Sequence, residues 1–72
     1  MALKEIDEAI KLNPNIALAY ARRGSIYYRL GDFQRATMNW NIALKLDPEF
    51  TEIQYLLQAS KDNRLSSTEM KN

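Results

Sequence analysis

The chain has 72 residues, of which 46% are hydrophobic and 26% are charged, and its basic and acidic residues nearly balance to leave a formal net charge of +1. A chain of this length holds one small domain, and its balanced charge argues against nucleic-acid binding, which needs a dense basic footprint. The lack of cysteine and histidine excludes disulfides, zinc–thiolate sites, and the commonest general base and metal ligand.

Helices are predicted throughout, because apolar residues recur at helical spacing between the glycines and prolines. The first helix is expected over residues 2–13 and ends before Pro14, since the residue before a proline is disfavoured in the α region. The second is expected over 15–30, with Asn15 as its cap. Gly31 stops it by supplying the left-handed conformation that often ends a helix.

The third helix is expected over residues 33–46, with the carboxylate of Asp32 as its cap and an Asp-Pro pair after its end. A fourth helix is expected over 49–63, because proline and glutamate suit the first turn of a helix. Residues 65–72 are polar and have no apolar stripe, so we predict a disordered tail after a helical domain at 1–64. No segment alternates apolar and polar residues with a period of two, and no strand is expected.

The sequence also repeats itself. Leu-Asn-Pro at residues 12–14 matches Leu-Asp-Pro at 46–48, which is 34 residues later, and the same shift pairs Ala9 with Ala43. A fixed period of this length is typical of helical hairpins that bury their apolar faces only by stacking on their neighbours.

This pattern resembles the tetratricopeptide repeat, in which an aromatic residue, Leu-Gly and Tyr are followed by Ala, a second aromatic residue and Pro at fixed spacings. The resemblance implies an all-α fold of antiparallel hairpins stacked as a short right-handed α-solenoid, in the order B-A-B-A, where A and B are the two helices of a repeat. Residues 17–50 form the complete repeat. The residues expected to carry its packing are Tyr20, Gly24, Tyr27, Phe33, Ala36, Trp40, Ala43 and Pro48.

The small residues at Gly24, Ala36 and Ala43 would let helices A and B approach closely, with aromatic side chains around the contact. The alternative is a generic helical hairpin with accidental spacing. Tyr20 replaces the usual Trp, and Arg23 stands where Leu is usual. We expect Arg23 to lay its aliphatic stem on the apolar surface and keep its charge in water.

The fourth helix carries Gln54, Gln58 and Lys61 where the repeat has an aromatic residue, Gly and Tyr. These positions share one helix face, and a polar outer face suits a terminal helix. We therefore expect the array to end here; the alternative is a degenerate internal repeat.

The first helix places Ala2, Ile6 and Ala9 where a preceding helix A would contact them. An exposed apolar stripe on so small a domain favours association. These residues are therefore candidates for self-association.

No pattern in the sequence indicates catalysis. Carboxylate pairs such as Glu5 and Glu8 have the spacing of solvated helix faces, and the glycines match no phosphate-binding loop. No apolar run approaches the roughly 20 residues of a membrane-spanning helix, and residues 1–8 do not resemble a signal peptide. We expect no enzyme activity, no cofactor, no metal, no membrane partner and no nucleic-acid partner.

In the tetratricopeptide-repeat family, the A helices line a concave groove that receives an extended peptide or a helix of another protein. The resemblance places these residues along it: Leu18, Ala21, Arg22, Ser25, Tyr28, Arg29, Glu52, Tyr55 and Ala59. Arg22 and Arg29 fall on one side of the helix, and arginine suits forked recognition of carboxylates. The hypothesis is a groove for an acidic or C-terminal carboxylate segment; the alternative is that both arginines are simply solvated.

Some family members hold a terminal carboxylate with Lys and Asn side chains, but Ala21 and Ser25 do not supply that pair. The sequence thus predicts a cytoplasmic protein-binding module, and the alternative is a self-assembly element that forms homo-oligomers through its first helix. RNA binding is disfavoured, because the chain has one full repeat and almost no net charge.

Overall fold

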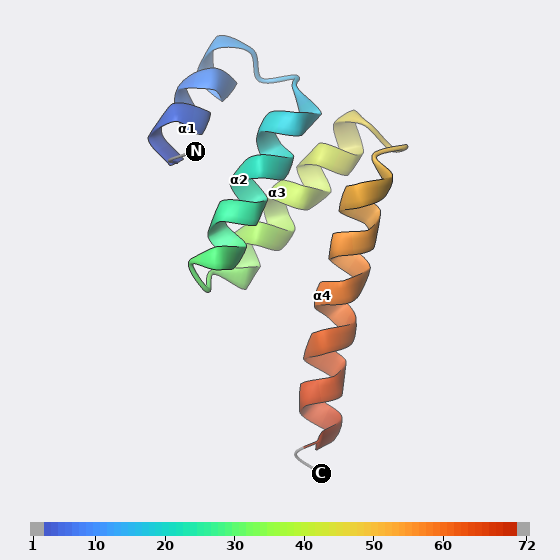
Figure 1. Ribbon diagram of the computed structural model, residues 1–72. Helices are drawn as coiled ribbons and strands as arrows, with labels where there is room; N and C mark the ends of the chain where they lie inside the picture. The colour runs from blue at the N-terminus through green and yellow to red at the C-terminus, as the bar shows by residue number, and fades with distance from the viewer. Residues whose placement is uncertain (1–2, 71–72) are drawn as a thin grey trace.

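The computed structural model describes residues 3–70, and the side chains of 3–60. Its helices are α1 (Leu3–Leu12), α2 (Ala17–Arg29), α3 (Phe33–Leu46) and α4 (Thr51–Met70). The chain reverses at each connection, so consecutive helices run antiparallel, and the second half of α4 projects beyond the α2–α3 hairpin (Figure 1). Residues 3–70 contain no strand, and the all-α prediction is confirmed.

The turn between α2 and α3 follows from Gly31 and Asp32. Gly31 has a φ of 85°, which glycine adopts at little cost. The N–H of Gly31 donates to the carbonyl of Tyr28 at 3.1 Å, and the N–H of Asp32 donates to that of Tyr27 at 2.9 Å, which together make a Schellman motif. Asp32 then caps α3, because its Oδ1 accepts from the N–H of Arg35 at 3.1 Å.

The 34-residue period of the sequence reappears in the hydrogen bonds at the helix ends. At the end of α1, the N–H of Asn13 donates to the carbonyl of Ala9 at 3.0 Å, and at the end of α3, the N–H of Asp47 donates to that of Ala43 at 2.9 Å. The two helices therefore end in the same way, at positions that the sequence overlay had paired.

The connections after α1 and α3 also match each other. Asn13 Oδ1 accepts from the N–H of Asn15 at 3.1 Å, and Asp47 Oδ1 accepts from the N–H of Glu49 at 3.2 Å. Because of these turns, α2 and α4 begin two residues later than expected, at Ala17 and Thr51. Asn15 is not a cap, because α2 begins at Ala17 without a side-chain cap.

The fourth helix differs from its expected bounds of 49–63 at both ends. It begins two residues later, at Thr51, because the turn at Asp47 occupies the intervening positions. It continues to Met70, where a disordered tail over 65–72 was expected. No glycine or proline follows Pro48 to stop the helix; residues 71–72 lie outside the described part of the chain.

Helices α2 and α3 make a close contact at the small residues. A Cβ atom on Gly24 would lie 2.5 Å from Trp40 Cδ1 and 3.0 Å from the carbonyl oxygen of Ala36. Ala36 and Ala43 are completely buried. The indole N–H of Trp40 donates to the carbonyl of Ala21 at 3.2 Å, so this large side chain is buried with its polar group satisfied.

The other aromatic signature residues surround this contact. Tyr20 and Tyr27 are partly buried against the core, whereas Phe33 lies at its margin and is 46% exposed. The ring of Phe33 packs edge-on against Tyr28, with centroids 5.0 Å apart. Pro48 is exposed in the connection to α4.

Helix α4 packs against α3 through Ile53 and Leu57, which are buried in the core with Trp40. Its polar face includes Gln54, which is exposed and donates its side-chain N–H to the carbonyl of Pro48 at 2.6 Å. Gln58 on this face is also exposed. The side chain of Lys61 lies outside the described residues.

The structure corrects two expectations, namely that Ile6 is exposed and that Arg23 keeps its charge in water. Ile6 is only 2% exposed, because α1 packs against α2 and covers this side chain within the same chain. Ala9 is partly buried, and Ala2 lies outside the described residues. Arg23 does not direct its charge into water but hydrogen-bonds to Asn39 and Asp7.

Candidate functional site

A depression of about 370 Å³ is lined by residues of α1, α2 and α4 and by the connection that leads into α4. Its lining residues are Ile6, Leu18, Ala21, Arg22, Ser25, Ile26, Arg29, Phe50, Glu52 and Ile53. Helix α3 lies behind α2 in the view of Figure 1 and contributes no lining residue. The depression is therefore formed by the two A-type helices, with α1 at one side.

Helix α2 supplies the largest share of the lining. Leu18, Arg22, Ser25 and Arg29 follow one another at intervals of four, three and four residues, which places them on one helix face. Ala21 is buried beside them. With Glu52 from α4, the structure brings together six of the residues that the resemblance had placed in the groove.

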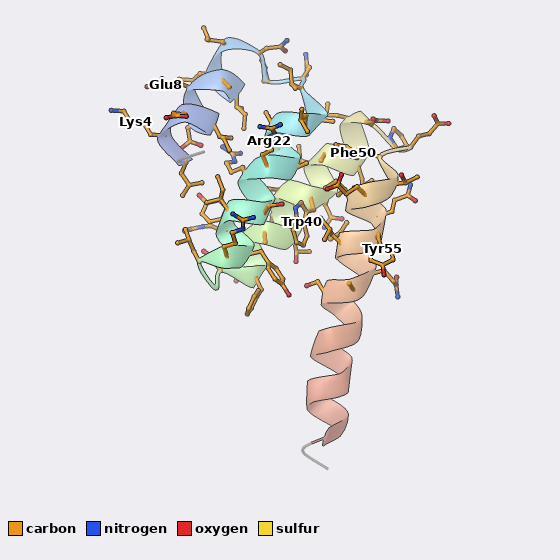
Figure 2. All side chains as sticks on the ribbon, viewed as in Figure 1. Lys4, Glu8, Arg22, Trp40, Phe50 and Tyr55 are labelled. Atoms are coloured by element: carbon orange, nitrogen blue, oxygen red, sulfur yellow. The ribbon has the colours of Figure 1, made fainter. Side chains whose placement is uncertain are left out.

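Other expected groove residues lie elsewhere. The Tyr28 ring packs between Phe33 and Trp40, at centroid distances of 5.0 and 5.6 Å. Tyr55 projects from α4 and is 77% exposed, and neither it nor Ala59 lines the depression. Figure 2 shows Tyr55 on the part of α4 beyond Phe50, apart from Arg22 on α2.

Four apolar residues of the lining were not among the groove residues expected from the sequence. Ile26 could have been found, because it lies four residues after Arg22 on the same helix face. Ile6, Phe50 and Ile53 come from outside α2, and their inclusion depends on how the other helices pack. The depression is therefore more apolar than the sequence indicated.

The polar groups of the site are few and different in kind. Arg22 and Arg29 are exposed at the depression, and α2 contains no acidic residue. Glu52 is the acidic residue of the described lining. The Ser25 hydroxyl donates to the carbonyl of Ala21 at 3.2 Å. This arrangement places two arginines and one glutamate beside apolar side chains.

Among the described residues, no group of three or more acidic, histidine or cysteine side chains could hold a metal ion. Within the same residues, no helix combines the length and apolarity needed to cross a bilayer.

Residues 17–50 match the tetratricopeptide repeat family. The chain is 44% identical over 48 residues to Tetratricopeptide repeat protein 6 of Homo sapiens, an alignment that covers 67% of the chain and 9% of that protein.

Two further relatives have names that refer to heat shock proteins. The chain is 39% identical over 51 residues to Hsp70-Hsp90 organizing protein 3 of Arabidopsis thaliana, covering 71% of the chain and 9% of that protein. It is 39% identical over 46 residues to Heat shock protein STI1 of Saccharomyces cerevisiae, covering 64% of the chain and 8% of that protein. The chain thus spans less than a tenth of the length of these relatives. No solved structure matches it significantly.

The family match covers the α2–α3 hairpin with its close contact at Gly24, and the 34-residue period extends the pattern to α1 and α4. The tetratricopeptide repeat is a protein-interaction repeat, and its presence supports a role in protein–protein interaction. The chain belongs to the tetratricopeptide-repeat family, with its complete repeat at residues 17–50.

Proposed function

We propose that the chain binds a peptide or helix of another protein in the depression between α2 and α4. The observation that carries this proposal is the composition of the α2 face, which presents two arginines together with Leu18 and Ile26. Phe50 and Ile53 extend the apolar surface onto α4 and the connection that leads into it. An apolar surface with a few convergent polar groups is the usual composition of a binding site.

The two arginines indicate that the ligand carries carboxylate groups. Arginine presents a fork of N–H donors that matches a carboxylate, and Arg22 and Arg29 both line the depression. The ligand is therefore an acidic segment whose apolar side chains face the depression. Ala21 is buried, and the Ser25 hydroxyl already donates to a carbonyl within α2. The two arginines therefore bind acidic side chains of the ligand, and these positions provide no clamp for its terminal carboxylate.

The spacing of the arginines limits the spacing of the acids. Arg22 and Arg29 are seven residues apart on α2, which corresponds to about 10.5 Å along the helix axis. A helical ligand would match this distance with acids seven residues apart. An extended ligand in the polyproline II conformation would match it with acids three residues apart, because this helix has three residues per turn and rises roughly 3.1 Å per residue.

Selection from a random peptide library displayed on phage tests the proposal. We expect the peptides recovered on the immobilised chain to be enriched in Asp and Glu. Arg22→Ala and Arg29→Ala should each weaken binding of a selected peptide, measured as Kd by fluorescence anisotropy. Arg35→Ala is the matched control, since it removes the same charge from an exposed side chain on α3. Recovery of neutral or basic peptides, or equal loss in all three variants, would contradict the proposal.

Self-association through α1 is not part of this proposal. Of the candidate residues for it, Ile6 is buried within the chain and lines the depression. It is therefore not available to a second copy while α1 stays docked.

A further inference from the structure

Arg23 connects three helices. Its Nε–H donates to Asn39 Oδ1 of α3 at 2.7 Å, and its Nη1–H donates to Asp7 Oδ1 of α1 at 2.8 Å. Its guanidinium also lies over the Tyr20 ring, 5.3 Å from the centroid. The side chain is 22% exposed, whereas that of Asp7 is 55% exposed. One arginine on α2 therefore reaches both of its neighbouring B-type helices.

Asn39 fixes the direction of the guanidinium. Asn39 is buried, and its amide N–H donates to the carbonyl of Arg35 at 2.8 Å. This bond sets the amide orientation and leaves Oδ1 as the acceptor for Arg23. Because Nε is held on the α3 side, Nη1 is left pointing to α1. A lysine ammonium is a compact charge without this fork and would not make both bonds in these directions.

The position on α4 that is equivalent to Arg23 holds an apolar residue. The residue 34 positions after Arg23 is Leu57, which is only 8% exposed and belongs to the apolar core that joins α3 and α4. The two junctions of the chain thus use different chemistry at the same repeat position. The α3–α4 junction is apolar, whereas the α1–α2 junction has an ion pair at its edge.

We propose that Arg23 is the specificity-determining residue for docking of a preceding helix on α2: it accepts a helix with an acid at the position of Asp7 and makes this junction sensitive to salt. Raised ionic strength screens the partly exposed ion pair and loosens α1, while the apolar α3–α4 junction stays closed. Since Ile6 of α1 lines the depression, release of α1 would also remove one wall of the binding site. That last consequence rests on the proposed function.

Hydrogen exchange of the full chain, followed by mass spectrometry, tests this inference without a ligand. The variants compared are Asp7→Asn, which removes the ion pair, and Glu8→Gln, a matched control that neutralises the next acidic residue on the exposed surface of α1. We expect Asp7→Asn to speed exchange in α1 by about two- to five-fold, the range for partly exposed ion pairs. Residues 51–60 of α4 should be unchanged.

Salt dependence separates a specific ion pair from a general loss of packing. In the unsubstituted chain and in Glu8→Gln, 1 M NaCl should speed exchange in α1 but not in 51–60. In Asp7→Asn, this effect of salt on α1 should disappear. Arg23→Lys should behave like Asp7→Asn while circular dichroism shows the same helix content. Equal exchange in Asp7→Asn and Glu8→Gln, or α1 exchange that is independent of salt in the unsubstituted chain, would overturn the inference.

Discussion

The contact between Gly24 and Trp40 makes a sharp prediction for the variant Gly24→Ala. At most helix positions this change stabilises a protein, because alanine is favoured over glycine by about 1 kcal/mol. Here the added Cβ would lie 2.5 Å from Trp40 Cδ1, 2.6 Å from Trp40 Nε1 and 3.0 Å from the backbone carbonyl of Ala36. The indole is buried and the carbonyl belongs to α3, so neither can move without shifting the helix pair.

Overpacking and the loss of a hydrogen bond both oppose the gain in helix propensity. Overpacking a close-packed core costs about 1–3 kcal/mol. Displacing the indole would also lose its hydrogen bond to Ala21, which contributes about 0.5–1.5 kcal/mol. After subtracting the gain in helix propensity, Gly24→Ala should destabilise the chain by about 1–3 kcal/mol. For a domain of this size, the Tm should fall by at least about 4 °C.

Thermal unfolding followed by circular dichroism at 222 nm measures the change. Trp40→Val provides the internal control, because the valine side chain ends at its γ carbons and lacks the δ and ε atoms that the new Cβ would meet. In that background Gly24→Ala should cost much less, and the difference is the coupling between the two positions. A Gly24→Ala variant that is as stable as the parent chain, or additive costs in the double variant, would refute the close contact.

Two further predictions concern the stability of the hairpins, and both are checked by the same unfolding measurement. Asp32→Ala should lose about 1 kcal/mol, because it removes the carboxylate that caps α3, whereas Asp32→Asn should retain most of the stability; equal loss in both would contradict the cap. Leu57→Ala should cost about 2–5 kcal/mol, because Leu57 is buried between α3 and α4, while Tyr55→Ala, a change at an exposed position on the same helix, should have almost no effect; similar losses in the two variants would count against the packing of α4.

Much of the fold was predictable, because the signals that set it are local. Gly31 and Asp32 determine the α2–α3 turn through contacts with residues close to them in the sequence. The 34-residue overlay paired the ends of α1 and α3, and each of these ends has the same hydrogen bond within its own helix. The starts of α2 and α4 were misplaced, because the side chains of Asn13 and Asp47 form turns that occupy the next positions. Asn and Asp fit turns and helix caps equally well, so residue type alone does not decide between them.

The site was predictable only where it lies on one helix. The helical period brings Arg22, Ser25 and Arg29 onto one face before any tertiary contact is known. Phe50 and Ile6 join them through the packing of other helices, which no spacing within α2 reveals. The partners of Arg23 were missed for the same reason, since Asp7 and Asn39 are each 16 residues away in the sequence.

Amide chemical shifts in NMR, recorded while a phage-selected acidic peptide is titrated into the chain, test the binding surface most directly. We expect the largest changes at Leu18, Ser25 and Ile53 on α2 and α4, with little change at the exposed residues Met38 and Ile42 on α3. Changes centred on Met38 and Ile42, with α2 and α4 unaffected, would contradict a ligand site in the depression between the A-type helices.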